Sequence, residues 1–128
     1  MKWSKIVMEN EEKLKIKKSH YNSNDEWIKQ NHTYIGYIEN ELVVTAFLNE
    51  YEDYLLIDRL DTEEEYQNKG YGTQMLKEIQ KDFNTVYIVP DNKDAARLYE
   101  RIGRSVVDKP IYDKELYALD NGFGVFEL

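Results

Sequence analysis

The sequence contains no cysteine and only two histidines among its 128 residues. The absence of cysteine excludes disulfide bonds, a thiolate nucleophile and a zinc site built from thiolates. Two histidines are too few for a histidine-rich metal cluster, so we expect no metal site. We place His20 in a polar loop and His32 just before a strand, where a lone histidine is usually a solvated side chain; a catalytic role for either is the alternative.

Long apolar runs are also missing. No stretch has the length of a membrane-spanning helix or the pattern of a signal peptide, so we expect a cytoplasmic protein that does not bind membranes. Positive charge is in the minority, because 17 Lys and Arg against 25 Asp and Glu leave a net charge of −8. This balance opposes nonspecific binding to nucleic acid, which we do not expect as a partner, and favours neutral or cationic partners.

The residues that are present predict one folded domain. Hydrophobic residues make up 41% of the chain and 11 residues are tyrosine, which is typical of a globular protein and not of a disordered one. A chain of 128 residues is long enough for a single modest core. We therefore treat residues 1–128 as a single domain.

The first half of the chain predicts strands. Residues 13–17 alternate like a strand at an exposed sheet edge. Ser23, Asn24 and Asp25 resemble a helix start, with Trp27 and Ile28 expected on the buried side of a short helix. Three antiparallel strands then follow between residues 33 and 60, at 34–38, 42–48 and from 55 onward.

The second half alternates strands and helices. An acidic turn leads into a helix at about 71–82, with Met75, Leu76 and Ile79 on its apolar face. A short buried strand at 86–89 precedes a second helix, which Asn92 opens and Gly103 ends. The apolar face of the second helix consists of Ala95, Ala96, Leu98, Tyr99 and Ile102.

Two more strands are expected, at residues 105–107 and 123–126. A meander followed by two strand–helix units predicts an α+β fold, with a mixed, mostly antiparallel sheet flanked by helices.

The turn before the first helix is suited to an anion. Gly70 and Gly72 allow backbone conformations and close approaches that a Cβ atom blocks. The first amides of the helix lack internal partners, and the helix dipole adds positive charge there, so a phosphate or pyrophosphate fits. The turn lacks the Gly-Lys-Ser/Thr ending of an NTP-binding loop and the third glycine of a dinucleotide fingerprint. A plain glycine-rich helix entry is the alternative for this segment alone.

The turn resembles the acetyl-CoA loop of the GNAT (Gcn5-related N-acetyltransferase) superfamily, Gln/Arg-x-x-Gly-x-Gly/Ala, with Gln67, Gly70 and Gly72 at the defining positions. The next motif of the family is Asn-x-x-Ala-x-x-Leu-Tyr-Glu-x-x-Gly-Phe. It is matched by Asn92, Ala95, Leu98, Tyr99, Glu100 and Gly103, and it departs at Arg104, where the family has phenylalanine. Two motifs in the family's order are stronger than either alone.

The resemblance implies a GNAT-like fold with a reduced N-terminal helical region, and acetyl-CoA (coenzyme A) as co-substrate. The turn would hold the CoA pyrophosphate, and the strand before it would pair with the pantetheine arm. The implied cofactor-binding residues are Leu60, Asp61, Thr62, Gln67, Asn68, Lys69, Gly70, Tyr71, Gly72, Thr73, Asn92, Ala95, Leu98 and Tyr99. The nearby cations that could meet CoA phosphates are Lys69, Lys93 and Arg97, for which solvated surface charge is the equal alternative.

The resemblance also implies a direct transfer of the acetyl group to a primary amine of a small molecule, protein or peptide. Tyr99 matches the family's general acid, which protonates the departing thiolate. Leu56 stands at one place where the family often has a glutamate base. Asp58, two residues along, is the best substitute, with Asp61 and residues 63–65 behind it; a mainly structural Tyr99 and a solvated acidic turn are the alternatives.

The acceptor side is the least defined. The family builds one wall from two helices between its first two strands, and this chain has room for one short helix near residues 24–30. Either the groove is open or a second subunit completes it, so a homodimer is possible. The other wall is expected from residues 110–122, with Tyr112, Glu115 and Tyr117. The alternatives to an enzyme are a CoA-binding sensor and a protein-interaction module on the same scaffold.

Overall fold

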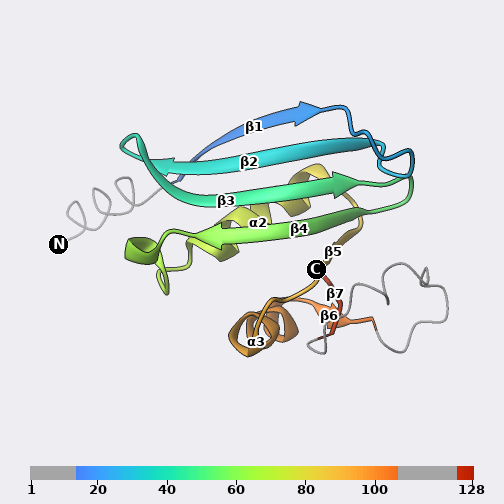
Figure 1. The fold of residues 1–128 in the computed structure, drawn as a ribbon. Helices are drawn as coiled ribbons and strands as arrows, with labels where there is room; N and C mark the ends of the chain where they lie inside the picture. The colour runs from blue at the N-terminus through green and yellow to red at the C-terminus, as the bar shows by residue number, and fades with distance from the viewer. Residues whose placement is uncertain (1–13, 107–123) are drawn as a thin grey trace.

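The computed structural model describes residues 14–106 and 124–128 of the chain (Figure 1). A seven-stranded mixed sheet has the order β1-β2-β3-β4-β5-β7-β6. The strands are β1 (Lys15–Tyr21), β2 (Gln30–Ile38), β3 (Glu41–Glu50), β4 (Leu55–Thr62), β5 (Val86–Ile88), β6 (Arg104–Ser105) and β7 (Phe126–Glu127). The helices are the 3-10 turn η1 (Glu64–Tyr66), α2 (Tyr71–Asp82) and α3 (Lys93–Ile102). The α+β fold class predicted from the sequence is therefore confirmed.

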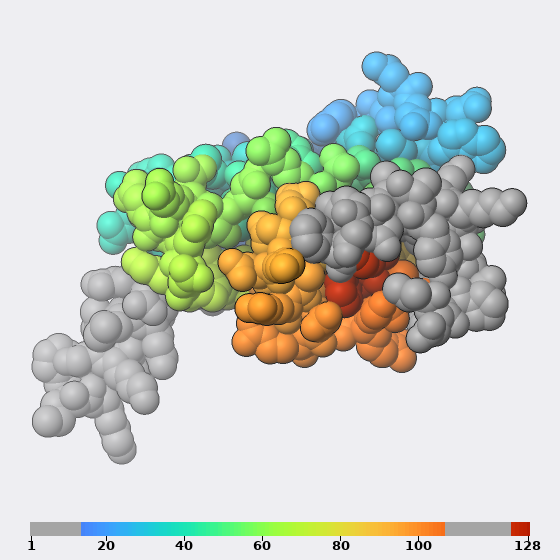
Figure 2. All heavy atoms as spheres, turned by 60° about the horizontal axis from the view of Figure 1, so that its bottom comes forward, coloured from blue at the N-terminus to red at the C-terminus, as the bar shows by residue number. Residues whose placement is uncertain are grey.

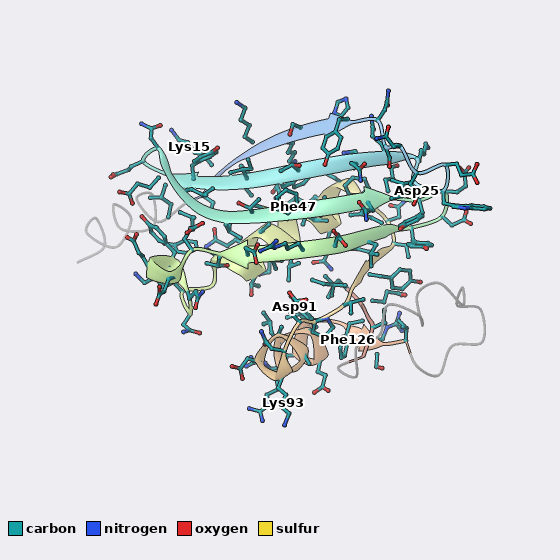
Figure 3. All side chains as sticks on the ribbon, in the orientation of Figure 1. Lys15, Asp25, Phe47, Asp91, Lys93 and Phe126 are labelled. Atoms are coloured by element: carbon teal, nitrogen blue, oxygen red, sulfur yellow. The ribbon has the colours of Figure 1, made fainter. Side chains whose placement is uncertain are left out.

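The first four strands form an antiparallel meander. Alternate residues face α2, which lies across one face of these strands (Figure 1). On α2, Met75, Leu76 and Ile79 have at most 1% of their surface exposed, as expected from the helical spacing. They pack in one core cluster with strand residues such as Val44, Leu48, Leu55 and Ile57. The opposite face of β1–β4 carries no helix within the described residues, and Phe47 lies on it, 38% exposed (Figure 3).

A second, smaller cluster covers the other face of the sheet near its β6 end. Leu56, Tyr87, Val106 and Val125 are all buried there. Leu56 is therefore a core residue, and its position in β4 carries no titratable side chain. This cluster ties the last strands to the centre of the sheet.

The connection between β1 and β2 differs from the prediction. No helix forms between residues 22 and 29, and Trp27 is 68% exposed. The polar residues do make helix-start contacts, since Trp27 N donates to Asp25 Oδ1 (2.9 Å) and Ile28 N to the Asp25 carbonyl (3.2 Å). Lys29 N then bonds the Glu50 carbonyl (2.7 Å) and draws the chain into β2 after one turn.

Both histidines lie within strands, not beside them, so their predicted positions were wrong. His20 in β1 pairs with His32 in β2, and His32 Nε2 lies 2.8 Å from Glu50 Oε1. The pairing of β1 with β2 extends to Tyr21, four residues beyond the strand that the alternation predicted. Ile102, expected on the buried side of α3, is 37% exposed.

Gly103 ends α3 for a reason other than a left-handed cap. Its φ of −142° is extended. A Cβ atom at this position would lie 2.4 Å from the Glu127 carbonyl oxygen, so the close approach of α3 to β7 requires a glycine.

Within the described residues no helix is both long enough and apolar enough to span a bilayer. The expected acceptor wall at residues 110–122, the strand positions 107 and 123, and residue 13 of the first strand lie outside the described residues.

Candidate functional site

A left-handed residue shapes the turn between β4 and α2. Gly70, the N-cap of α2, has φ of +87°, a conformation that disfavours any residue with a Cβ. Gln67 Nε2 donates to the Thr62 carbonyl oxygen (3.1 Å) and fastens the turn to the end of β4. The first bond to the Gly70 carbonyl comes from Gln74 N (3.0 Å), so the amides of Gly72 and Thr73 have no acceptor inside the helix. The turn therefore presents backbone donors at the positive end of a helix dipole.

Gly72 faces the end of β4 at ordinary contact distance. A Cβ atom there would lie 3.6 Å from Thr62 Oγ1 and 3.9 Å from Leu60 Cδ2. An alanine therefore fits without displacement, whereas a longer side chain must extend into the space in front of the turn.

The first turn of α3 is capped by Asn92. Its Oδ1 accepts a hydrogen bond from Ala95 N (2.8 Å), which satisfies one of the free amides at the helix start. The cap fixes the helix that carries Leu98 and Tyr99. Asn92 thus has a structural role in addition to any contact with a ligand.

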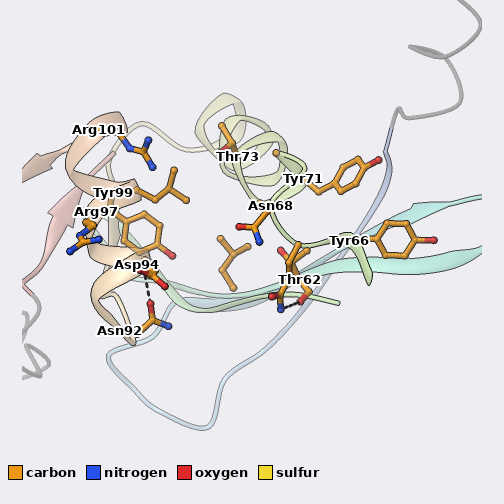
Figure 4. Close-up of a pocket in the computed structure, with 16 residues that line it drawn as sticks. Thr62, Tyr66, Asn68, Tyr71, Thr73, Asn92, Asp94, Arg97, Tyr99 and Arg101 are labelled. Atoms are coloured by element: carbon orange, nitrogen blue, oxygen red, sulfur yellow. Dashed lines mark hydrogen bonds between the residues drawn. The ribbon is translucent and has the colours of Figure 1, made fainter. Parts of the chain in front are cut away.

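A cleft opens because β4 and β5 part. The two strands pair in parallel only from Leu55 to Ile57 of β4 and from Val86 to Ile88 of β5. Beyond that point a cavity of about 740 Å³ lies between the glycine turn and α3 (Figure 4). The space-filling view shows the η1 segment and α3 side by side on this face of the molecule (Figure 2). A smaller cavity of about 220 Å³ adjoins it and shares Leu60, Thr62, Gln67, Asn92, Ala95 and Tyr99.

The cleft brings most of the predicted cofactor residues together. The larger cavity is lined by Leu60, Thr62, Gln67, Asn68, Gly70, Tyr71, Gly72, Thr73, Asn92, Ala95, Leu98 and Tyr99. Asp61 lines the smaller cavity only. Lys69 lines neither cavity, and its ammonium lies 5.8 Å from the centroid of the Tyr66 ring. Of the three cations expected near phosphates, only Arg97 faces the cleft, whereas Lys93 does not.

Tyr99 is 6% exposed and lines both cavities. Burial, helped by the negative charge of Asp91, raises the pKa of Tyr99 to about 12. No hydrogen bond within the described residues involves its hydroxyl, and no buried side-chain oxygen or nitrogen there lacks a partner. The hydroxyl therefore reaches the cleft, protonated and able to donate a hydrogen bond.

Asp58 lies at an irregularity in β4. Phe47 pairs with Arg59 and Leu48 with Ile57, so Asp58 is the unpaired residue of a β-bulge. Its exposed carboxylate lines the smaller cavity together with Tyr99. Asp61 lines the same cavity but accepts a hydrogen bond from Arg59 Nε (2.5 Å). Within that cavity Asp58 is thus the carboxylate of β4 without an arginine partner.

Further residues of the two cavities were not singled out from the sequence. Tyr66 and Arg101 line the larger cavity, Asp94 lines it at the start of α3, and Asp91 lines the smaller one. Arg101 follows Arg97 by one helical turn, and that spacing was a signal that could have found it. Asp91 carries no such signal, because only the fold places it beside Tyr99.

Comparison with known proteins finds a matching family pattern and similar folds. The sequence pattern of the acetyltransferase (GNAT) family matches residues 3–103. An acetyltransferase from Bacillus subtilis, solved in complex with CoA, has a TM-score of 0.55 and 20% identity, over 73% of this chain and 78% of that one. The ribosomal-protein-S18-alanine N-acetyltransferase from Escherichia coli has a TM-score of 0.56 and 12% identity, over 89% and 93%. No curated protein sequence matches the chain.

Proposed function

The chain belongs to the GNAT acetyltransferase family, and from that premise we propose that it is an N-acetyltransferase whose acceptor is a primary amine of a small molecule or a protein. Acetyl-CoA is the acetyl donor of this family and the co-substrate here. The observation that carries the proposal is the cleft, in which a turn of free amides and the Tyr99 hydroxyl face one space.

The residues of the cleft fit acetyl-CoA. The helix-start amides at Gly72 and Thr73 are suited to a pyrophosphate, and the absence of a Cβ at Gly72 leaves room in front of them. The inner edge of β4 beyond Ile57 is not paired with β5, so its backbone groups are available to an extended pantetheine arm. The Asn92 side chain, at the far wall, caps α3 and lines both cavities.

The co-substrate supplies a thioester, whose carbonyl carbon bonds to the amine nitrogen as its carbon–sulfur bond breaks. Asp58 accepts the proton that the amine loses, directly or through one water. Tyr99 donates a hydrogen bond to the sulfur as negative charge develops on it, and CoA leaves as a thiolate that takes up its proton from water. Asp58 thus takes the proton that the amine loses, and Tyr99 stabilises the negative charge on the sulfur. No covalent enzyme intermediate is needed.

The test is a thiol-release assay with acetyl-CoA and a panel of amines. Since the protein has no cysteine, every thiol that appears comes from CoA. We expect amine-dependent thiol release that Asp58→Asn lowers by about 10²-fold, the low end for a general base. Glu63→Gln, an exposed residue of the same acidic stretch that lines neither cavity, is the matched control.

Two results contradict the proposal in different ways. CoA binding without turnover on any amine would identify a CoA-binding sensor. Neither binding nor turnover would leave a protein-interaction module on this scaffold. Turnover that is independent of Asp58 would instead place the base elsewhere in the cleft.

A further inference from the structure

Two arginines of α3, across the cavity from the glycine turn, line the cleft. Arg97 and Arg101 lie one helical turn apart on α3, and both line the larger cavity (Figure 4). Among the described residues they are the only cationic side chains that line it. In a chain with a net charge of −8, two guanidinium groups at one ligand cavity call for an anionic ligand.

In the part of the chain that the structure describes, neither arginine contributes an ion pair to the stability of the fold. Within the described residues no ion pair includes Arg97 or Arg101, whereas Arg59 pairs with Asp61 and Arg104 with Glu127. Asp94 lines the same cavity but forms no ion pair with either arginine. Both guanidinium groups are exposed, and their planar, forked donors match the geometry of a phosphate.

We propose that Arg97 and Arg101 bind the phosphate at the 3′ position of the CoA ribose, and that this contact makes the protein select CoA over dephospho-CoA. The inference rests on the proposed function. Coenzyme A carries two separate anionic groups, a pyrophosphate and a ribose phosphate. The amides at Gly72 and Thr73 provide for the first, and the arginine pair across the cavity provides for the second.

The experiment compares the affinities for CoA and dephospho-CoA by calorimetric titration at low and physiological salt. The variants are Arg97→Gln, Arg101→Gln and the double substitution. We expect the parent protein to bind CoA about tenfold more tightly than dephospho-CoA, a modest factor because the arginines are exposed and screened. The double variant should bind both ligands with the affinity that the parent has for dephospho-CoA.

Lys93→Gln is the matched control, because it removes one positive charge from the same helix at a position that lines neither cavity. It should leave the preference for CoA unchanged. Arg97→Lys with Arg101→Lys keeps the charge but not the fork, and should keep only part of the preference.

Four results overturn the inference. Equal affinity of the parent for the two ligands removes the need for a ribose-phosphate site. An equal loss of both affinities in the double variant would mean that the arginines contact the pyrophosphate or support the fold. If Lys93→Gln lost as much of the preference for CoA as Arg101→Gln, the preference would be due to net charge and not to contacts of the two arginines. If the parent binds neither ligand, the proposed function fails as well, and the two failures are thereby distinguished.

Discussion

Tyr99 is better suited to donate a hydrogen bond than to transfer its proton completely. Burial and the charge of Asp91 raise its pKa to about 12, whereas a free thiol has a pKa of about 8.5. Full transfer to a free thiolate would then cost roughly 5 kcal/mol, from about 1.4 kcal/mol per pKa unit. The hydroxyl instead stabilises the charge that develops on the sulfur and remains protonated at every physiological pH.

Tyr99→Phe tests this role. The substitution keeps the ring, whose centroid lies 6.3 Å from that of Phe126, and removes only the hydroxyl. We expect kcat to fall about 10- to 100-fold, as for the loss of one hydrogen bond to a charged group, roughly 1.5–3 kcal/mol. The KM for acetyl-CoA should change little. Steady-state kinetics check this, and an unchanged kcat would make Tyr99 a structural residue only.

Buried tyrosines also predict a loss of stability at high pH. Burial and a hydrogen bond from its hydroxyl to Asp82 Oδ2 (2.5 Å) raise the pKa of Tyr34, and burial with the charge of Asp91 raises that of Tyr99. The unfolded chain loses these protons near pH 10 while the folded protein keeps them. The stabilisation is therefore complete below pH 10 and is lost as the pH rises to 12 and beyond.

Urea unfolding at pH 9, 10 and 11 measures this effect. The free energy of unfolding should fall across the series, and Tyr99→Phe should make the fall shallower. A free energy that rises or stays level between pH 9 and 11 would contradict the assigned pKa shifts.

At the scale of elements, the edge strand β1 is fastened to α2 by charge. Lys18 Nζ lies 2.9 Å from Glu78 Oε1 and 2.7 Å from Asp82 Oδ2. The hydrogen bond to Lys18 lowers the pKa of Glu78. Burial raises the pKa of Asp82, but hydrogen bonds from Lys18 and Tyr34 outweigh it and leave that pKa lowered.

Lys18→Met should lower the free energy of unfolding by about 0.5–1 kcal/mol at neutral pH, because these groups are partly exposed and screened by solvent. Since the pKa values of the two carboxyls are lowered, the stabilisation is present above their ordinary range, about pH 4, and is lost as the pH falls further. Urea unfolding at pH 7 and at about pH 3 gives the comparison. An equal effect at both pH values would mean that the methylene stem of Lys18, not its charge, stabilises the fold.

Gly103, at the end of α3, has no room for a side chain. Gly103→Ala would bring a Cβ to 2.4 Å from the Glu127 carbonyl oxygen, so α3 and β7 must separate. We expect a loss of about 1–3 kcal/mol, the usual range for overpacking. Thermal unfolding checks this, with Gly72→Ala as the control that meets only ordinary contacts. Equal melting temperatures for the two variants would contradict the close packing of α3 on β7.

The elements that the sequence predicts well are those with a strong local signal. The bounds of α2 follow from its helical spacing and the glycine turn before it, and Asn92 caps α3 as expected. The failures occur where tertiary pairing decides. His20 has no strand preference of its own but continues β1 because β2 pairs with it, and Trp27 follows genuine helix-start contacts that β2 cuts short after one turn.

The same difference between local signals and tertiary pairing applies to the candidate site. Motif residues of the turn and of α3 meet in one cleft, as the resemblance implied. Asp91 was missed because no local pattern distinguishes it from surface charge, whereas the spacing of Arg101 one helical turn after Arg97 was a signal that was not used. The β-bulge that sets the position of Asp58 depends on its pairing with β3 and was likewise invisible in the sequence of β4.

At the scale of the whole molecule, the net charge of −8 affects how strongly the protein attracts a cationic acceptor. An acidic protein attracts a polyamine or a lysine-rich peptide over a distance that salt shortens. We expect the KM for a polycationic acceptor to rise several-fold between about 0.01 M and 0.3 M salt. The KM for a monoamine with no other charged group should rise less. Kinetics with matched amines at both salt concentrations check this, and equal salt dependence would limit charge recognition to the reacting amine.

The proposed function depends on binding of acetyl-CoA by the turn at Gly70–Gly72. Calorimetric titration of acetyl-CoA into the parent protein, Gly72→Ala and Gly72→Glu tests it most directly, because a Cβ at Gly72 meets only ordinary contacts. We expect micromolar binding by the parent and by Gly72→Ala, and loss of binding in Gly72→Glu, whose carboxylate enters the anion site. Binding that survives in Gly72→Glu, or is absent from the parent, would contradict it.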